Sequence, residues 1–226
     1  MTATIQVPEP VDAEQTPSHR RVVLWTVFVT VVILTALAFF AVGRLTVAAQ
    51  QVADDGADAG FARDMQAHHA QAVEMALAVR DTSANEEIRA IAYDIATTQQ
   101  HQSGQMFAWL QEWGLPQAGP EPPMAWMTAG TGEHGTAHQG QPAATPEERM
   151  EGMATPEQLQ ALRSASGADA DRLFADLMIR HHQGGVAMAT AALNLAQTAR
   201  VRDFAAGLVE AQNAEILALQ DLRARL

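Results

Sequence analysis

The chain has 226 residues, enough for one well-packed domain with appendages. Acidic residues outnumber basic residues by 26 to 14, and arginine supplies every basic charge because lysine is absent. An acidic surface repels phosphate backbones, so we expect no nucleic-acid partner. The absence of cysteine excludes disulfides, thiolate zinc sites, iron–sulfur clusters and cysteine nucleophiles. A metal ion in this protein must therefore be held by His, Met, Asp or Glu.

The first element in the chain is an uncharged apolar run from Val22 to Val42. It is long enough to cross the hydrocarbon core of a bilayer as a helix. Arg20 and Arg21 precede it, and the positive-inside rule keeps these residues in the cytoplasm. We therefore expect residues 1–21 to form a cytoplasmic tail, residues 22–42 to form a single membrane anchor in the lipid bilayer, and the C-terminal part to be exported.

A cleaved signal peptide is the alternative interpretation of the same run. Val47, Ala48 and Ala49 have the small-residue pattern of a cleavage site, and cleavage after Ala49 would give a secreted protein. The apolar run is longer than a normal signal core, which favours the retained anchor. Both interpretations place the functional domain outside the cytoplasm.

An internal repeat organises the rest of the chain. The offset is 113 positions, the separation of Phe61 from Phe174, and the register needs no gap. It pairs Met65 with Met178, His68 with His181, His69 with His182, Met75 with Met188, Ala92 with Ala205 and Gln99 with Gln212. Each repeat therefore consists of a helix with a His-His pair and a helix that follows it.

Helix-forming residues and stop signals predict where these helices lie. The first repeat, residues 59–113, holds helices over about 59–79 and 85–113, and the second, residues 168–226, holds helices over about 168–196 and from 199 to the end. Residues 43–58 form a linker and residues 114–167 a long crossover with one short helix at 156–165. With no strand signal anywhere, this order predicts an all-α protein whose domain, residues 59–226, is a four-helix bundle.

Helical geometry predicts which side chains face the core. At about 100° per residue, Met65, His68 and Met75 share an arc with the apolar residues, and His69 lies on the flank of that arc. The equivalent positions in the second repeat have the same arrangement. On the following helices, Gln99 and Gln212 fall within apolar stripes, and buried amides need hydrogen-bond partners. We expect them to bond the histidines, because metal-bound histidines commonly donate their second ring N–H to such a group.

Two interpretations of the histidine pairs compete. A single copy would fit ordinary core packing, because methionine is a common filler of helical cores. Two copies at identical spacing on inward arcs favour metal binding. Four-helix proteins that hold two irons carry Glu three residues before the histidine, whereas this chain has Met65 and Met178 there. Thioether and imidazole together suit copper in the form of Cu(I), and offer little to Mg²⁺, Ca²⁺ or iron oxidation chemistry.

At these residues the chain resembles domain-of-unknown-function family 305, whose hallmark is a repeated F-x-x-x-M-x-x-H-H-x-x-x-x-x-M-A on a ferritin-like bundle. Both copies match, as FARDMQAHHAQAVEMA (61–76) and FADLMIRHHQGGVAMA (174–189). Members include exported bacterial copper-binding proteins, so the resemblance implies a ferritin-like fold and copper handling at the cell envelope. The metal ligands that it implies are Met65, His68, His69, Met75, Met178, His181, His182 and Met188, with Met150 and Met153 as auxiliary positions.

The second helices depart from the Q-x-x-E-I-x-x-M pattern of that family. Gln102 and Ser103 stand in place of Glu-Ile in the first repeat, and Leu219 stands in place of Met in the second. Glu215 keeps the carboxylate of the pattern and is a further auxiliary position. If these positions contribute ligands, each half has lost one, and the two sites differ in affinity or in metal.

The leading functional hypothesis is therefore an extracytoplasmic, membrane-anchored protein that captures or buffers copper or confers copper tolerance, with a copper-delivery protein as a possible partner. A ferritin-like metal-dependent oxidoreductase is one alternative, and a metal-free structural or interaction bundle is another. The oligomeric state is open. His134 and His138, four residues apart in the crossover, are at most a weak auxiliary site.

Overall fold

The computed structural model describes residues 19–48, 52–128 and 150–226, and within them the chain is entirely helical. The chain divides into two compact units, Met1–Gln50 and Gln51–Leu226, which are described separately. Most of the predicted cytoplasmic tail, the cleavage position after Ala49, and both His134 and His138 lie outside the described residues.

Helix α1 (His19–Ala48) is the described part of the first unit. Its span His19–Arg44 has a mean hydropathy of 2.6 and is the one helix among the described residues that is long and apolar enough to cross a membrane. Thr26, Thr30 and Thr35 each donate their hydroxyl to the carbonyl four residues earlier, which satisfies the polar groups of the apolar helix internally. The helix thus has the properties of a membrane span or of a signal sequence.

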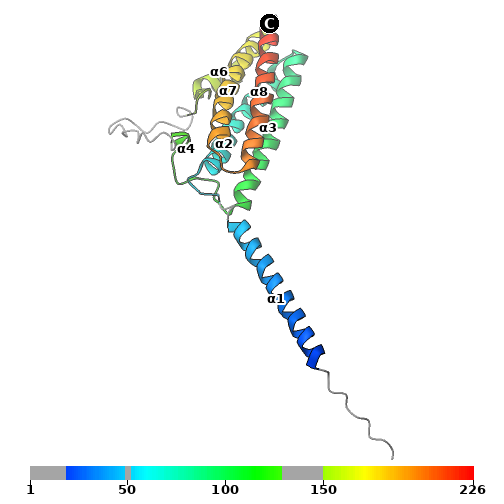
Figure 1. Cartoon of the computed structure of the whole chain (residues 1–226). Coiled ribbons are helices and arrows are strands. Elements are labelled where there is room, and N and C mark those ends of the chain that lie inside the picture. Colours follow the sequence, from blue (N-terminus) through cyan, green and yellow to red (C-terminus); the bar gives the residue numbers. More distant parts are fainter. Residues whose placement is uncertain (1–18, 49–51, 129–149) are drawn as a thin grey trace, which may run out of the picture. The chain divides into compact units, whose positions relative to one another are not determined.

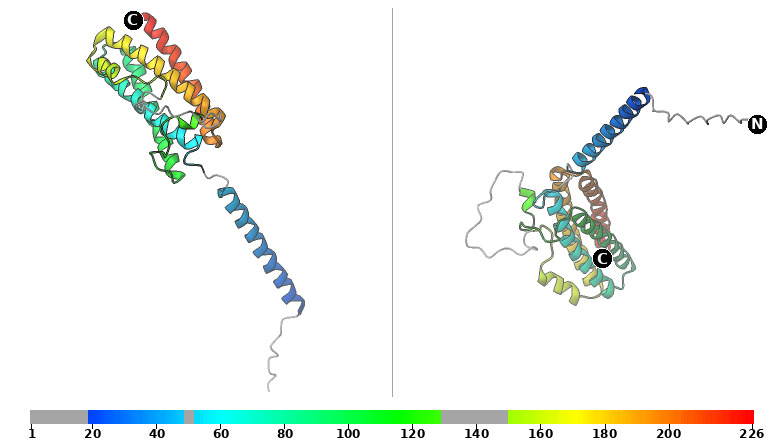
Figure 2. Two further views of the ribbon diagram at one scale, coloured as in Figure 1. Left: turned by 90° about the vertical axis from the view of Figure 1, so that its left-hand side faces the viewer. Right: turned by 90° about the horizontal axis from the view of Figure 1, so that it is seen from below.

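The second unit is a bundle of α2 (Ala57–Thr82), α3 (Glu86–Glu112), α7 (Gly167–Leu195) and α8 (Ala199–Arg225). Helix α2 packs against α3, α7 packs against α8, and the two hairpins meet where α2 packs against α7 (Figure 1, Figure 2). Ion pairs join α3 to α8 at both ends, Glu112 to Arg200 at 2.5 Å and Glu87 to Arg225 at 2.7 Å. Neighbouring helices are therefore antiparallel, and one long crossover joins the hairpins, as in ferritin-like bundles.

Helices α3 and α8 begin where capping side chains satisfy their first backbone N–H groups, whereas the N-cap residues of α2 and α7, Gly56 and Ser166, make no side-chain cap bond. Asn85 accepts from the N–H groups of Glu87 and Ile88, and Thr198 accepts from that of Val201. Thr155 and Gln158 form a reciprocal capping box that starts α6 (Pro156–Ser164). These caps explain why the boundaries expected from the sequence lie close to those of the structure.

A buried carboxylate ties the start of the first hairpin to the turn of the second. Asp58 at the start of α2 accepts the backbone N–H groups of Gln197 and Thr198 at 2.8 and 2.9 Å and the Thr198 hydroxyl at 2.6 Å. Charge-assisted bonds of this kind are stronger than neutral ones. These bonds fix the position of α2 along the axis of α7.

The described parts of the crossover pack onto α2 and α7. Trp126 of α4 (Ala125–Thr128) lies on Gly60, where a Cβ would come within 2.4 Å of the indole. Asp64 accepts the Trp126 Nε1–H and the Met124 N–H, both at 2.8 Å. Helix α6 contacts α2 and α7 further along the bundle. The crossover therefore covers part of the seam between the two hairpins.

The bundle core consists of two hydrophobic clusters. The first cluster contains Phe61, Met65, Met106, Trp109, Met188, Val201, Ala205 and Leu208 among its members. The second contains their repeat equivalents, Phe174, Met178, Leu219, Leu222, Met75, Ile88, Ala92 and Ile95. The clusters are thus pseudo-symmetric images of each other, and the His-His pairs lie between them on α2 and α7.

Candidate metal centre

The His-His pairs form the centre of a buried polar layer. His68 and His69 on α2 and His181 and His182 on α7 all have an exposed fraction of 0%. Gln99 on α3 and Gln212 on α8 are also buried, so each of the four bundle helices contributes polar side chains. A polar layer between two apolar clusters is costly unless its groups find partners.

The two histidine pairs meet across the contact between α2 and α7. The rings of His68 and His181, which are repeat equivalents, have their centroids 3.7 Å apart with planes inclined by 34°. The ring of His182 lies 6.4 Å from that of His181. Antiparallel packing of two identical motifs thus brings histidines that are distant in sequence into one group.

Most polar atoms of this layer have no hydrogen-bond partner among the described residues. Seven of the eight imidazole nitrogens are in this state, namely both nitrogens of His68, His69 and His181 and Nδ1 of His182. The amide groups of Gln99 and Gln212 are in the same state, so they do not bond the histidines as the sequence suggested. Buried polar atoms left without partners cost about 1–3 kcal/mol each, which points to a ligand as their partner.

Glu215 of α8 supplies the one hydrogen bond that an imidazole of this layer makes among the described residues. Its Oε2 lies 2.5 Å from Nε2 of His182, and its side chain remains partly exposed. At the equivalent position in the first repeat, Gln102 approaches His69 without reaching hydrogen-bond geometry. The bond to Glu215 leaves Nδ1 of His182 as the ring atom available to a metal.

Burial keeps the histidines in the neutral form that metal binding needs. Desolvation lowers the pKa of His68 and that of His69 to about 3, and the neighbouring imidazoles act in the same direction. The pKa of His181 is held well below its usual value by burial and by the three other histidines. A neutral imidazole has a ring nitrogen whose lone pair carries no proton. At neutral pH, no proton therefore has to leave before a metal ion binds.

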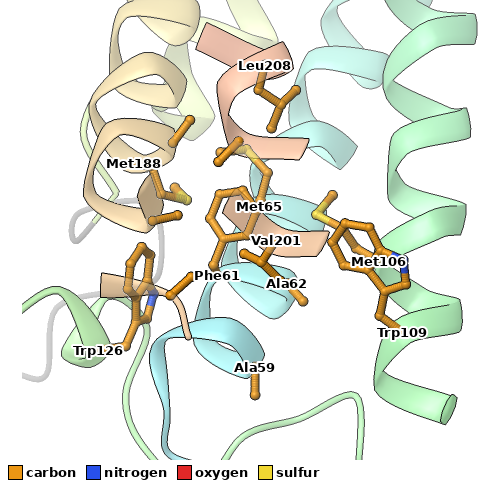
Figure 3. Close-up of a cluster of buried hydrophobic side chains, with 14 of the residues drawn as sticks. Ala59, Phe61, Ala62, Met65, Met106, Trp109, Trp126, Met188, Val201 and Leu208 are labelled. Atoms are coloured by element: carbon orange, nitrogen blue, oxygen red, sulfur yellow. The ribbon is translucent and has the colours of Figure 1, made fainter. Parts of the chain in front are cut away.

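Methionines flank the histidine layer on both sides. Met65 from α2 and Met188 from α7 belong to the first cluster, and Met75 from α2 and Met178 from α7 belong to the second. All four are buried. Figure 3 shows Met65 and Met188 directed into the first cluster together with Met106 from α3. Each side of the layer therefore has thioethers from both repeats.

A crossover segment lies against α7 beside the histidines. Gly152 has φ +85°, and a Cβ there would come within 2.4 Å of the Arg180 carbonyl oxygen. A Cβ at Gly184 would come within 1.8 Å of the Glu151 carbonyl oxygen. The two glycines allow backbone to approach backbone, and this places Met150, 3% exposed, in the first cluster. Met153 packs against the same cluster and is partly buried.

Gln71 holds Ala154, the next residue of this segment, through both polar atoms of its side-chain amide. It donates to the Ala154 carbonyl at 2.9 Å and accepts the Ala154 N–H at 2.7 Å. Its repeat equivalent is Gly184, so the two repeats hold the same segment by different means. Gln71, Asp58 and Asp64 were not predicted from the sequence, because their partners are distant residues that no helical periodicity reveals.

His69 differs from its expected position. It was expected on the flank of the inward arc, yet its exposed fraction is 0%, as for His68. The contact with α3 on one side and α7 on the other makes the buried face of α2 wider than a single stripe. Gln212 is similarly confined, because its Oε1 would lie 2.3 Å from a Cβ at Gly185.

The donor atoms of this layer fit a soft metal better than a hard one. Within residues 19–48, 52–128 and 150–226, no group of three or more His, Cys, Asp or Glu side chains is arranged to hold a metal ion. Hard ions prefer carboxylate and carbonyl oxygens, whereas the donors of this layer are imidazole nitrogens together with the carboxylate of Glu215. Unpartnered imidazole nitrogens beside buried thioethers are the donors that Cu(I) and Ag(I) prefer.

The fold and this layer define a ferritin-like helical-bundle protein built from two repeated hairpins with a histidine and methionine centre. The family model for a domain of unknown function, DUF305, matches residues 58–223, and the chain belongs to this family. No curated protein matches the sequence.

Solved structures of the family share the fold. The chain is 42% identical to a DUF305 protein from Streptomyces coelicolor to which secretion has been ascribed, with a TM-score of 0.67 and coverage of 76% of this chain and 95% of that one. A DUF305 fragment from Deinococcus radiodurans is 32% identical, with a TM-score of 0.59 and coverage of 75% and 97%.

The protein CopM has a similar fold at lower identity. Its Cu(I)-bound form is 23% identical to this chain, with a TM-score of 0.52 and coverage of 77% of this chain and 98% of that one. CopM has also been solved in Cu(II)-bound and Ag-bound forms. These similarities establish the shared fold.

Proposed function

We propose that this protein captures copper as Cu(I) outside the cytoplasm and holds it between α2 and α7. The observation that carries the proposal is the buried layer of four histidines. Seven of its ring nitrogens have no partner in the part of the chain that the structure describes, and methionines of both repeats lie on either side. Capture of this kind serves buffering or tolerance, and it allows transfer to a copper-accepting protein.

The residues that would hold the ion come from both repeats. His68 and His181 lie at the contact of α2 and α7, and their rings are close enough to serve one ion or two adjacent ions. His69 and His182 extend the layer toward α3 and α8, where Glu215 holds Nε2 of His182. Met65, Met188, Met75 and Met178 supply the thioethers, so binding joins the two hairpins and should stabilise the bundle.

The likeness to CopM supports the choice of metal. CopM has been solved with Cu(I), Cu(II) and Ag, and it shares the fold of this chain. The donor set of this chain favours the monovalent ions among these, because thioethers are soft ligands. The absence of cysteine leaves methionine as the sole source of sulfur.

The N-terminal helix supports an extracytoplasmic site. Helix α1 meets the requirements of a single membrane span, and His19, Arg20 and Arg21 at its start favour a cytoplasmic N-terminus. We propose that the anchor is retained and that residues 59–226 face the outside of the membrane. Protease protection of the N-terminus but not of the bundle in intact cells would test this orientation.

The proposal is tested by an anaerobic Cu(I) titration of the full-length chain in detergent against a chromophoric competitor. The variant carrying His68→Ala and His181→Ala is expected to lose tight binding and to keep its helical circular dichroism. His101→Ala is the matched control, because His101 is exposed on α3 and should leave Cu(I) affinity unchanged. Equal affinity of the double variant and the wild type would overturn the proposal and support a metal-free structural bundle.

A further inference from the structure

The methionines are distributed unequally between the two clusters. The chain has ten methionines, and the nine that follow Met1 all belong to one of the two clusters or pack against it. The second cluster has Met75 and Met178. The first has the remaining seven, four buried and three packed against them, which are Met65, Met106, Met124, Met127, Met150, Met153 and Met188. The fold is repeated, but the supply of thioethers is not.

The bundle fold does not require this inequality. On the first side, α2, α3, α7 and α8 contribute Met65, Met106, Met188 and Leu208. On the second side, the equivalent positions are Met178, Leu219, Met75 and Ile95. Of these four pairs, Met106 with Leu219 is the one in which the first side has a thioether and the second side has an alkyl group. Leu and Met have similar volumes and replace each other in cores at a cost of less than about 1.5 kcal/mol, so packing accepts either residue at both positions.

The polar side chains beside the outer histidines also make the first side softer than the second. Along α3, Gln102 lies between Gln99 and Met106, on the side of the first cluster, whereas Glu215 on α8 lies between Gln212 and Leu219, on the side of the second. The second side thus offers a carboxylate-bonded imidazole and two thioethers. The first side offers neutral amides and at least three buried thioethers. The first side is therefore the softer of the two.

Negative charge gathers at the surface beside the first cluster. A cavity of about 270 Å³ is lined by Asp54, Asp55, Asp64 and Glu121 and by one arginine, Arg63. Arg63 pairs with Asp54 and donates to the Pro116 carbonyl at 3.0 Å. Trp126, a member of the first cluster, forms part of the same wall. A cation approaching this wall meets an attractive potential next to the richest supply of thioethers.

We propose that the histidine layer forms two unequal half-sites, and that the half-site facing the first cluster is the high-affinity site for a soft monovalent cation, Cu(I) or Ag(I). Met106 is the residue that sets the difference, and Leu219 is its inactive equivalent in the other half. This inference rests on the proposed function, because it assumes that the layer binds copper. It assigns an order of filling that follows from this chain's own side chains.

The test uses Ag(I), which is soft and monovalent and does not change oxidation state, with the full-length chain in detergent. Methyl-labelled methionine gives one NMR signal per methionine. One equivalent of Ag(I) is expected to shift the signals of Met65, Met106 and Met188, and a second equivalent those of Met75 and Met178. Shifts of all five in parallel, or of Met75 and Met178 first, would overturn the order of filling.

Paired substitutions locate the determinant. Loss of even an outer partner of a metal ligand costs about 10- to 100-fold in affinity, so Met106→Leu should weaken the tighter Ag(I) site by at least about tenfold. Leu219→Met should strengthen the weaker site, and the double exchange should reverse the order in which the signals shift. Met127→Leu is the control, because Met127 packs only at the periphery of the first cluster.

The outcomes separate this inference from the function on which it rests. If Met106→Leu and Leu219→Met both leave the stepwise affinities unchanged while the His68 and His181 variant abolishes binding, copper binding stands and the unequal half-sites are wrong. If no methionine signal responds to Ag(I) at all, both are wrong. Unchanged circular dichroism of each variant shows that the comparison is made between folded proteins.

Discussion

The two repeats share the order and register of their helices but differ in their contacts, and the difference separates what the fold needs from what a site needs. Phe61 and Phe174, His68 and His181, and Gln99 and Gln212 occupy equivalent places in both halves. These pairs build the core and the polar layer. Among the pairs that differ are Met106 with Leu219, Gln102 with Glu215, and Gln71 with Gly184. Met106 and Leu219 belong to the two clusters, and Gln102 and Glu215 approach the outer histidines, so these differences lie where a ligand would be bound.

The largest expected effect concerns the buried histidine layer, to which both repeats contribute. The folded pKa of His68 and of His69, about 3, is lower than the unfolded value of 6.5, so below pH 6.5 the unfolded chain binds more protons. The free energy of unfolding should therefore fall as pH decreases from 6.5 toward 3, by about 1.4 kcal/mol per pH unit for each histidine that stays neutral. Denaturant unfolding of the metal-free protein between pH 7 and pH 4 measures the slope.

His68→Leu should reduce that slope, and His101→Ala should not, because His101 is exposed. A free energy of unfolding that stayed constant over this range would contradict the neutral, buried state of the histidine layer. Bound Cu(I) should add stability over this whole pH range and lose this effect near pH 3, where protons compete for the ring nitrogens.

The next effect tests the two different ways in which the repeats hold the segment 150–154. Gly184→Ala should destabilise the bundle by about 1–3 kcal/mol, because its Cβ would overlap the Glu151 carbonyl oxygen. Gln71→Ala should also cost about 1–3 kcal/mol, since the N–H and carbonyl of Ala154 lose their partners. Gly207→Ala is the matched control, because nothing lies within 4 Å of its Cβ position, and it should stabilise α8 by about 0.5–1 kcal/mol. Thermal unfolding of the three variants ranks them.

A smaller effect concerns the partners of the outer histidines. Glu215→Gln makes the two repeats alike at this position and removes the carboxylate from Nε2 of His182. We expect about a tenfold loss of Cu(I) affinity in the second half-site and little change in the first. The stepwise Cu(I) titration detects this as a wider separation between the two binding constants. A loss confined to the first half-site would show that Glu215 acts elsewhere.

The smallest effect concerns the acidic wall beside the first cluster. Asp55→Asn with Glu121→Gln removes two exposed charges from the cavity, and should slow the association of Ag(I) by roughly twofold at low ionic strength. The difference should vanish near 1 M salt, where screening extends over only about 3 Å. Stopped-flow mixing at two salt concentrations measures it. A difference that persisted in high salt would point to a structural cause.

Local sequence signals predicted the fold well. The repeat of 113 positions and the spacing of apolar residues predicted the four bundle helices, and the caps at Asn85 and Thr198 explain the starts of α3 and α8. The inward direction of His68, His181 and the flanking methionines followed from helical geometry. These features depend on neighbouring residues, which a single sequence displays directly.

Contacts between distant segments could not be predicted in this way. The bonds of Gln71 to Ala154, of Asp58 to the turn at Thr198, and the close approach of Gly184 to Glu151 depend on how the crossover lies on the bundle. The complete burial of His69 depends on the packing of two neighbouring helices, and the unpartnered state of Gln99 depends on distances across the core. None of these has a periodic signature.

The most direct test of copper binding by this layer is the copper K-edge X-ray absorption spectrum of the Cu(I)-loaded protein. The chain contains no cysteine, so any sulfur bound to copper must come from methionine. The expected spectrum shows both nitrogen and sulfur in the coordination shell, and the sulfur contribution falls in the Met65→Leu, Met188→Leu variant. A shell of nitrogen and oxygen alone would contradict the thioether and imidazole site.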